Sequence, residues 1–436
     1  VEREVIDTVF FGERTHVLEQ RGADEVYCQH INRIYDMIQE SYALSHDGGR
    51  MDVLMWGDIV GKNPEMLKKL PHDMQYIVWS YGAKESYADM IAPFAQIRRQ
   101  QGNAFWVAPG VSHWSSTPQV RNYMQNIAYL ARDGYKAGAR GLMNTAWDDS
   151  GESLFGDCWH AMAWAAEMAW HPITSTDPEQ ARLELAQRER IFNKNYSRIA
   201  TAEYLALNPG AEAPAGRSLT DMIYAVGDLN TSPWVGDWFN TAALMQPLME
   251  FYPADLGDDM LTRCDSVDAV VGRVLNIVDS NMLPHFAYAC HRILCVSEKS
   301  RLRVMLHRAL TQQPGTAPSK SQIQALCRKY FRTLHSLKLE YLRLWDEECT
   351  DYSRHIICSR YDQLGQEVQD ARQKVFISND YRDGKMYVPL PRPPHLLHRR
   401  WPQTLARRQP LPPPLHHRAQ LPRQGRQLLQ MGRTRL

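Results

Sequence analysis

Short apolar segments alternate with longer amphipathic segments through the first 172 residues of the chain. The apolar segments are seven to ten residues long and lie at 51–60, 75–82, 104–110 and 139–147. Runs of this length that end in turn or polar residues are typical of strands buried in a parallel sheet. The intervening segments have helical length, and lie at 24–44, 61–70, 84–100, 118–135 and 157–169. This alternation predicts βα units on a parallel sheet, and so an α/β fold class.

The pattern changes over 173–378, where the apolar positions follow a helical repeat and predict an α-helical domain. Two segments near its end each carry one apolar stripe. The stripes consist of Leu334, Leu337, Tyr341, Leu344 and Trp345, and of Ile356, Ile357, Tyr361, Leu364 and Val368. Pro/Gly-rich connectors at 206–216 and 311–322 interrupt the helical pattern.

The last segment, 379–436, shows neither pattern. Its final 46 residues hold nine Pro and ten Arg but no Lys, Asp or Glu. Such a composition cannot bury an apolar core, so we expect a disordered, basic tail. The change follows the strand-like sequence "DGKMYVPL" abruptly, and the bias toward Arg and Pro is what GC-rich DNA yields out of frame. We therefore interpret the tail as a frame-shifted translation.

The charge and the cysteine content of the chain limit the classes of binding partner and the cellular compartment that we expect. The formal net charge is +1, but with the tail set aside the body is acidic, with 40 basic and 49 acidic residues. The basic tail has the charge for nucleic acid but no fold and no Lys, so we predict no nucleic-acid partner. The eight Cys form no CxxC pair, which argues against a zinc site and for small core residues in a reducing compartment. We predict a cytoplasmic protein with no metal, no cofactor and no membrane partner.

The expected strands end in aromatic and acidic residues. Trp56 and Asp58 follow the first strand, Trp79 and Tyr81 the second, Trp114 the third, and Trp147, Asp148 and Asp149 the fourth. Side chains at the C-terminal ends of parallel βα strands converge on one mouth. Indole faces stack on the apolar face of a pyranose, and carboxylates accept its hydroxyl protons, so this set predicts a sugar site. The alternative is that these tryptophans are ordinary core at the rim of the sheet.

In order and spacing, these segments resemble a known family. "RMDVLMWGDIV", "LPHDMQYIVWSYGA", "AFWVAPGVSHWSST" and "GARGLMNTAWDDSGE" are similar to the family-20 glycoside hydrolases, the β-N-acetylhexosaminidases. The resemblance covers residues 7–172 and is closest to the bacterial branch with a helical C-terminal region. It implies the second half of a (βα)8 barrel over 1–172, followed by the α-helical domain at 173–378 and the disordered basic tail. It also implies that the chain starts after most of the first barrel half.

The resemblance further implies retaining cleavage of terminal N-acetylglucosamine or N-acetylgalactosamine, with the substrate's own acetamide as the nucleophile. In the family an Asp orients the acetamide and the adjacent Glu protonates the leaving oxygen. By motif position, Trp56, Trp79 and Trp147 would box the sugar. Asp149 would hold ring hydroxyls, and Trp114 would lie at the mouth. The implied partners are glycans that contain N-acetylhexosamine, and nothing in the sequence indicates an oligomeric state.

The Asp-Glu pair is where the chain departs from the family. Alignment of "VIDTVFFGERT" on Gly12 places Ile6 and Asp7 at the pair, which makes Asp7 the candidate catalytic residue. Asp24 and Glu25 are a second candidate pair, although their segment is typical of an acidic helix start. The last motif, "TAWDDSGE", also departs from the family's "TDWGDNGH".

Two functions are therefore open from the sequence. The first is an exo-β-N-acetylhexosaminidase whose chain, as given, hydrolyses poorly because the acid position is altered. The second is a non-catalytic relative that binds N-acetylhexosamines through the tryptophans.

Overall fold

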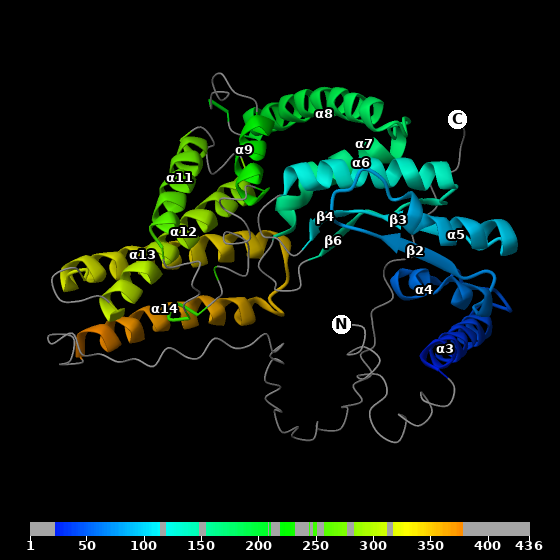
Figure 1. The fold of residues 1–436 in the computed structure, drawn as a ribbon, viewed down its shortest axis with the longest axis horizontal. Coiled ribbons are helices and arrows are strands. Elements are labelled where there is room, and N and C mark those ends of the chain that lie inside the picture. The colour runs from blue at the N-terminus through cyan, green and yellow to red at the C-terminus, as the bar shows by residue number, and fades with distance from the viewer. Residues whose placement is uncertain are drawn as a thin grey trace, which may run out of the picture. The chain divides into compact units, whose positions relative to one another are not determined.

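The computed structural model describes part of the chain (Figure 1), namely residues 22–113, 119–147, 154–207, 209–210, 219–231, 244, 247–250, 257–276, 283–311 and 317–377. The candidate residues Asp7, Trp114 and Asp149 lie outside these ranges, as does the predicted tail at 379–436. The chain divides into two compact units, Val1–Tyr387 and Val388–Leu436, and the described residues all belong to the first. The predicted boundary at 172/173 stays a prediction.

The predicted parallel strands are present. Four of them form one sheet in the order β1 (Leu54–Trp56), β2 (Gln75–Trp79), β3 (Phe105–Ala108) and β5 (Gly141–Leu142), with each neighbouring pair parallel. A second parallel pair joins β4 (Gly110–His113) to β6 (Thr145–Trp147). The expected strands at 104–110 and 139–147 are therefore each divided in two. The division coincides with Pro109, which has no N–H for a ladder, and with a register shift between Gly110 and Ser112.

Helices alternate with these strands as expected. They are α3 (Ala23–Ser45), α4 (Asp58–Lys62), the 3₁₀ helix η1 (Pro64–Lys69), α5 (Ala88–Gln101), α6 (Val120–Ala137), the 3₁₀ helix η2 (Phe155–Cys158) and α7 (Trp159–Trp170). The predicted helix at 61–70 is instead the short α4 followed by η1. The turn at Asn63 and Pro64 accounts for the interruption, because proline lacks the N–H that would continue an α-helix.

Helices α5 and α6 pack on the sheet (Figure 1). The contact between α6 and β3 requires a glycine, because a Cβ on Gly134 would lie 2.6 Å from Val107 Cγ2. The helix ends at Gly138, whose φ of 81° is the left-handed conformation that glycine adopts without a steric penalty. Because α6 also packs on α7 and α9, its charged residues Arg132 and Asp133 are buried.

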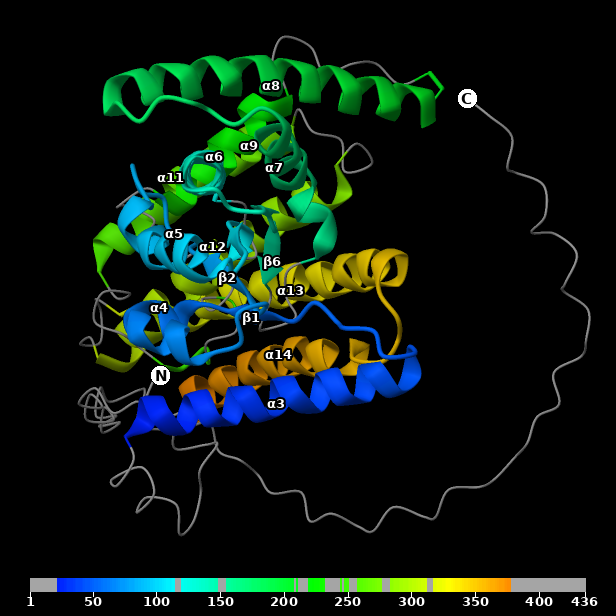
Figure 2. The same ribbon diagram turned by 90° about the vertical axis from the view of Figure 1, so that its right-hand side faces the viewer.

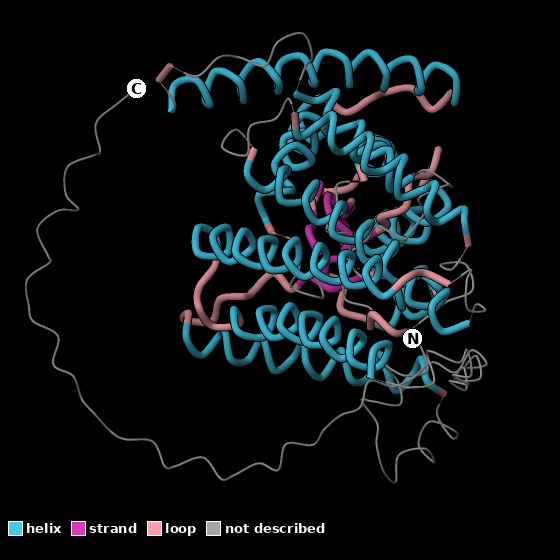
Figure 3. Tube along the Cα trace, turned by 90° about the vertical axis from the view of Figure 1, so that its left-hand side faces the viewer, coloured by secondary structure: helices cyan, strands magenta, loops and turns pink. Residues whose placement is uncertain are grey.

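The rest of the described chain is helical. It consists of α8 (Pro178–Leu207), α9 (Leu219–Thr231), α11 (Asp258–Leu275), α12 (Pro284–Thr311), α13 (Lys320–Glu348) and α14 (Arg354–Ile377). The long helix α8 contacts α6, α7 and α9 (Figure 2), while α12 packs between α11 and α13 and also contacts α14 and η2. Figure 3 shows the small group of strands, in magenta, among these helices.

The two predicted apolar stripes form the packed faces of α13 and α14, with one exception. Leu334, Leu337, Tyr341, Leu344, Ile357, Tyr361, Leu364 and Val368 are buried. Ile356 is 46% exposed, so its assignment to the stripe was wrong. Helix α13 begins with a capping box, in which Ser319 accepts a hydrogen bond from the Gln322 backbone and the Gln322 side chain accepts one from the Ser319 backbone.

All eight cysteines lie in the described residues and none forms a disulfide, and all but Cys349 and Cys358 are buried. Among the described residues, no helix is both long enough and apolar enough to cross a lipid bilayer.

Candidate functional site

Four aromatic side chains gather at the C-terminal ends of β1 and β2, which are neighbours in the four-stranded sheet, and of β6, which belongs to the second parallel pair. The rings of Trp56 and Trp147 have centroids 5.7 Å apart, although they follow strands nearly a hundred residues apart in the chain. Trp147 Nε1 donates a hydrogen bond of 2.5 Å to the Tyr81 hydroxyl, and Tyr81 stacks on Trp79 at 4.9 Å. We call these four residues the aromatic cluster. The structure therefore brings together all three tryptophans that the sequence assigned to a sugar box.

The side chains of the aromatic cluster differ in their exposure to solvent. Tyr81 is only 7% exposed, whereas Trp56 is 36% exposed, and Trp79 and Trp147 are half-buried. Tyr81 therefore supports the tryptophans from within, and the indole of Trp56 has surface left for a ligand. Half-exposed indoles that are fixed by packing offer apolar area at a low cost in side-chain entropy, which suits stacking against a flat sugar ring.

Tyr81 is the residue of the cluster to which the family resemblance assigned no role. Its signal in the sequence is the spacing in "WSYG", because residues two apart on extended chain point to the same side. Burial raises the pKa of the Tyr81 hydroxyl, and hydrogen bonds with Thr145 and Trp147 act against that shift. The charge of Asp58 also raises it, so the Asp58 carboxylate at the start of α4 lies close to the cluster. The hydroxyl stays protonated at neutral pH and can accept the indole N–H.

Two asparagines of α6 fix the backbone beneath Tyr81. Asn122 donates to the Tyr81 carbonyl at 2.7 Å and accepts from the Ala83 N–H at 2.8 Å. Asn126, which is fully buried, donates to the Ser80 carbonyl at 2.8 Å and accepts from the Gly110 N–H at 3.1 Å. Asn126 thus joins the turn after β2, which carries Tyr81, to the start of β4, the strand that pairs with β6.

Gly110 completes this support. A Cβ at this position would lie 2.7 Å from Cδ1 of the Tyr81 ring, closer than real Cβ contacts allow. The glycine therefore lets the tyrosine ring lie flat against the beginning of β4. Any larger residue would displace Tyr81 and, through its hydroxyl, Trp147.

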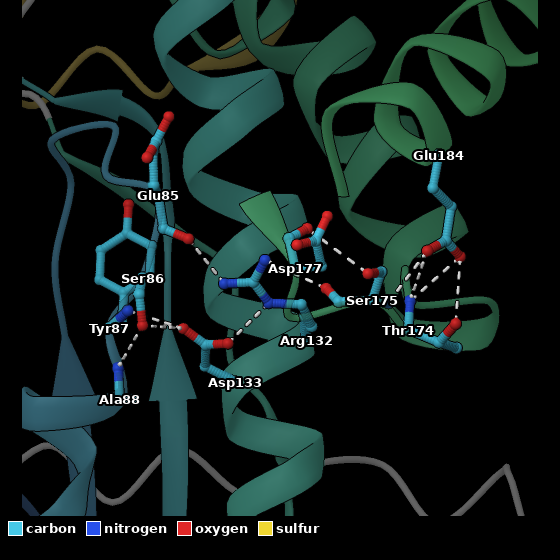
Figure 4. A network of polar contacts seen from close by, with 10 residues as sticks. All are labelled: Glu85, Ser86, Tyr87, Ala88, Arg132, Asp133, Thr174, Ser175, Asp177 and Glu184. Atoms are coloured by element: carbon cyan, nitrogen blue, oxygen red, sulfur yellow. Dashed lines mark hydrogen bonds and ion pairs between the residues drawn. The ribbon is translucent and has the colours of Figure 1, made fainter. Parts of the chain in front are cut away.

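A buried ion pair holds the loop that follows Tyr81 (Figure 4). Arg132 Nε donates to Asp133 Oδ1 at 2.6 Å, and the two side chains are 2% and 4% exposed. Asp133 Oδ2 also accepts from the Tyr87 N–H at 2.6 Å, while Arg132 donates to the Glu85 carbonyl at 2.7 Å and to the Ser175 carbonyl at 3.3 Å. The pair therefore ties α6 to the β2–α5 loop and to the segment after α7.

A second buried polar chain runs from α6 to α9. The Tyr123 hydroxyl donates to His160 Nδ1 at 2.7 Å, His160 Nε2 donates to Asn193 Oδ1 at 3.0 Å, and Asn193 Nδ2 donates to the Tyr224 hydroxyl at 3.2 Å. Burial lowers the pKa of His160 to about 4, and the bond to Asn193 opposes the shift only in part. His160 is therefore neutral at neutral pH, with its proton on Nε2, and joins four helices.

Asp24 and Glu25, the second candidate catalytic pair, occupy the first turn of α3, as the helix-start pattern predicted. The Asp24 carboxylate accepts a hydrogen bond from Asn63, and Glu25 forms an ion pair of 2.8 Å with Lys69. Both carboxylates are thus engaged in attaching α3 to η1. The primary candidate, Asp7, and the hydroxyl-binding candidate, Asp149, lie outside the described residues, so their placement stays a prediction.

Within the described ranges, no three His, Cys, Asp or Glu side chains are grouped so that they could hold a metal ion. A scan of known protein families finds no model that matches this chain, and a search of curated proteins finds no significant relative.

Proposed function

We propose that the chain carries the second half of the catalytic barrel of a retaining exo-β-N-acetylhexosaminidase, which releases terminal N-acetylglucosamine or N-acetylgalactosamine from glycans. The observation that carries this proposal is the aromatic cluster, in which Trp56, Trp79 and Trp147 meet at the C-terminal ends of parallel strands. Ligand sites of βα barrels lie at that end of the strands. A run of parallel strands in chain order, with helices between them, is also the arrangement inside such a barrel.

In the proposed mechanism, the substrate's 2-acetamido oxygen attacks the anomeric carbon and the glycosidic bond breaks with retention. The indoles of the aromatic cluster hold the acetamide and the ring, and exclude water from the reacting face. Asp149 accepts hydrogen bonds from ring hydroxyls. Asp7 is the candidate for proton donation to the leaving oxygen, and its side chain is one methylene shorter than the Glu of the family. We therefore expect weak turnover from this chain.

A second function is sugar binding without hydrolysis. It is favoured by the state of Asp24 and Glu25, which are engaged by Asn63 and Lys69 and so are poor candidates for the acid and its partner. The aromatic cluster needs no acid in order to bind a sugar, so binding and turnover have to be measured separately.

Binding is measured by titrating the chain with N-acetylglucosamine while tryptophan fluorescence is recorded, with glucose as the ligand that lacks the acetamide. The Trp56→Ala and Trp147→Ala variants should each weaken binding roughly two- to tenfold, since each removes one stacking surface. Trp170→Ala is the matched control, because Trp170 is 83% exposed at the end of α7 and belongs to no part of the cluster. Equal affinity for glucose, or equal loss in the Trp170 variant, would refute the proposed site.

Turnover is measured by release of p-nitrophenol from its β-N-acetylglucosaminide, and retention by NMR of the first sugar anomer formed. Binding without release of p-nitrophenol supports the non-catalytic alternative. Release with inversion would exclude the acetamide mechanism.

A further inference from the structure

Two carboxyl groups lie near each other where α13 contacts η2, the short helix that follows β6 in the described chain. One is Glu348, the last residue of α13, and the other is Asp157 in η2. The contact spans a long stretch of chain, since the Phe155 N–H donates to Glu348 Oε2 at 2.8 Å across 193 positions. The Gly156 N–H donates to Glu348 Oε1 at 2.7 Å.

Glu348 provides a helix cap from a distant part of the chain. Leu154, the residue before η2, has no side chain that could cap the turn, and η2 continues directly into α7. The first N–H groups of a helix have no partner within the helix and carry partial positive charge. A carboxylate that accepts from two of them makes charge-assisted hydrogen bonds, which are among the stronger ones in proteins.

A histidine on α12 completes the contact with Glu348. His285 Nε2 lies 2.5 Å from Glu348 Oε1, and both side chains are 15% exposed. The imidazole lies directly over Gly156, where a Cβ would be 2.3 Å from His285 Nδ1. Only glycine leaves room for the ring at this position, so the turn, α12 and α13 are fitted to one another.

Asp157 is an exception to the rule that buried polar atoms are paired. Both of its carboxyl oxygens are shielded from solvent, and neither has a hydrogen-bond partner among the described residues. The charged groups that face it are Glu348 from α13 and Arg292 from α12, with the thiol of Cys290 also on α12. A buried carboxyl group of this kind is best accommodated in its neutral form.

We propose that Asp157 and Glu348 make the contact between α13 and η2 pH-dependent. The contact is stable when Glu348 is ionised and Asp157 is protonated. When both groups are ionised, two negative charges lie in one buried region beside His285 and the contact weakens. When both are protonated, Glu348 loses the charge that holds the two N–H groups. The proposal concerns this contact alone and does not depend on sugar binding.

The pKa shifts of the two carboxyls support this window. Burial raises the pKa of Asp157, Glu348 raises it further, and Arg292 acts in the opposite direction, so the pKa lies well above 3.8. Burial also acts to raise the pKa of Glu348, but His285 and the two N–H groups outweigh it and the pKa lies below 4.5. The Asp157 contribution is therefore complete below its unfolded pKa and is lost as pH rises through its folded pKa. The Glu348 contribution is complete above its unfolded pKa and is lost as pH falls through its folded pKa.

The test is amide hydrogen exchange of Phe155 and Gly156 in the full chain, expressed as protection factors so that the intrinsic pH dependence cancels. Protection in the unmodified chain should fall as the pH rises through the raised pKa of Asp157. The Asp157→Asn variant cannot ionise at this position and should keep its protection across the same range. The Glu348→Gln variant should lose roughly tenfold to a hundredfold in protection at the lower pH. Glu340→Gln is the matched control, because Glu340 also pairs α13 with a histidine of α12, His291, at 2.9 Å.

The proposal is overturned if Asp157→Asn shows the same fall in protection as the unmodified chain, or if Glu340→Gln lowers protection as much as Glu348→Gln does. Far-UV circular dichroism establishes that each variant is folded. If Glu348→Gln does not fold, the comparison of Asp157→Asn with the unmodified chain decides the question.

Discussion

Removal of the Asp133 carboxylate should be among the most destabilising single changes in the described chain. The Asp133→Ala variant leaves the Arg132 guanidinium buried with one partner fewer, and it removes an acceptor from the Tyr87 N–H. Breaking a buried pair from one side typically costs about 3–5 kcal/mol. Arg132 keeps its bonds to the Glu85 and Ser175 carbonyls, which places the expected loss near the lower end, at about 3 kcal/mol.

The measurement is the free energy of unfolding of each variant in urea, with unfolding monitored by far-UV circular dichroism. The slope m of each unfolding curve is compared between variants. Glu347→Ala is the control, because the Arg343–Glu347 pair has the same N–O distance of 2.6 Å but side chains about half exposed. Exposed pairs of this kind contribute about 0–1 kcal/mol. The comparison of the two variants therefore separates the effect of burial on stability from the effect of the N–O distance. A loss for Asp133→Ala no larger than that for Glu347→Ala would refute the reasoning.

Three further predictions concern α6, α7 and the aromatic cluster. Gly134→Ala should lower the free energy of unfolding by about 1–3 kcal/mol in the same urea assay, since the added Cβ overlaps Val107; no loss would show that the helix can shift. Because the folded pKa of His160 is about 4, protonation opposes folding, so stability should be complete above about pH 6.5 and fall toward pH 4 by on the order of 3 kcal/mol. A pH series of urea unfolding should show this fall reduced in His160→Gln, and an unchanged slope would contradict it. Trp147→Phe should blue-shift or strengthen the fluorescence of Trp56 by replacing the indole whose ring centroid lies 5.7 Å away with a smaller phenyl ring, and an unaltered spectrum per tryptophan would argue that the two indoles are apart in solution.

The alternation of apolar and amphipathic segments was sufficient to predict the order of strands and helices. A parallel strand that is buried on both faces is visible in the sequence as a continuous apolar run, and the run at 75–82 contains β2 for that reason. The meeting of Trp56 and Trp147 agrees with the expectation that the ends of parallel βα strands converge, although the structure places β1 and β6 in two separate sheets.

The polar supports of the site could not be predicted in this way. Asn126, Arg132 and Asp133 lie on α6, and they are buried because this helix is covered on several sides. The same holds for Lys299, which is 1% exposed and donates to the Leu244 carbonyl at 2.6 Å. Periodicity within one helix reports one buried face. It does not report how many neighbours the folded chain places around that helix.

The contact between Gly156 and His285 could not be predicted from the sequence either. A glycine in "LFGD" reads as a turn signal, and nothing local shows that the ring of His285 will occupy the space of its absent side chain. Contacts between residues so far apart in the sequence depend on how α12 and α13 pack, which the sequence pattern does not specify.

The spacing of contacts along the chain has a consequence for synthesis on the ribosome. Leu54 pairs with Gln75 and Trp106 with Gly141, so each strand of the sheet meets a partner made shortly before or after it. All the residues of these pairings are synthesised before α13 is. The amide of Phe155, by contrast, must wait for a carboxylate that is translated 193 positions later. During that interval η2, which leads into α7, has emerged without its cap, so this turn is completed only after α13 has been synthesised.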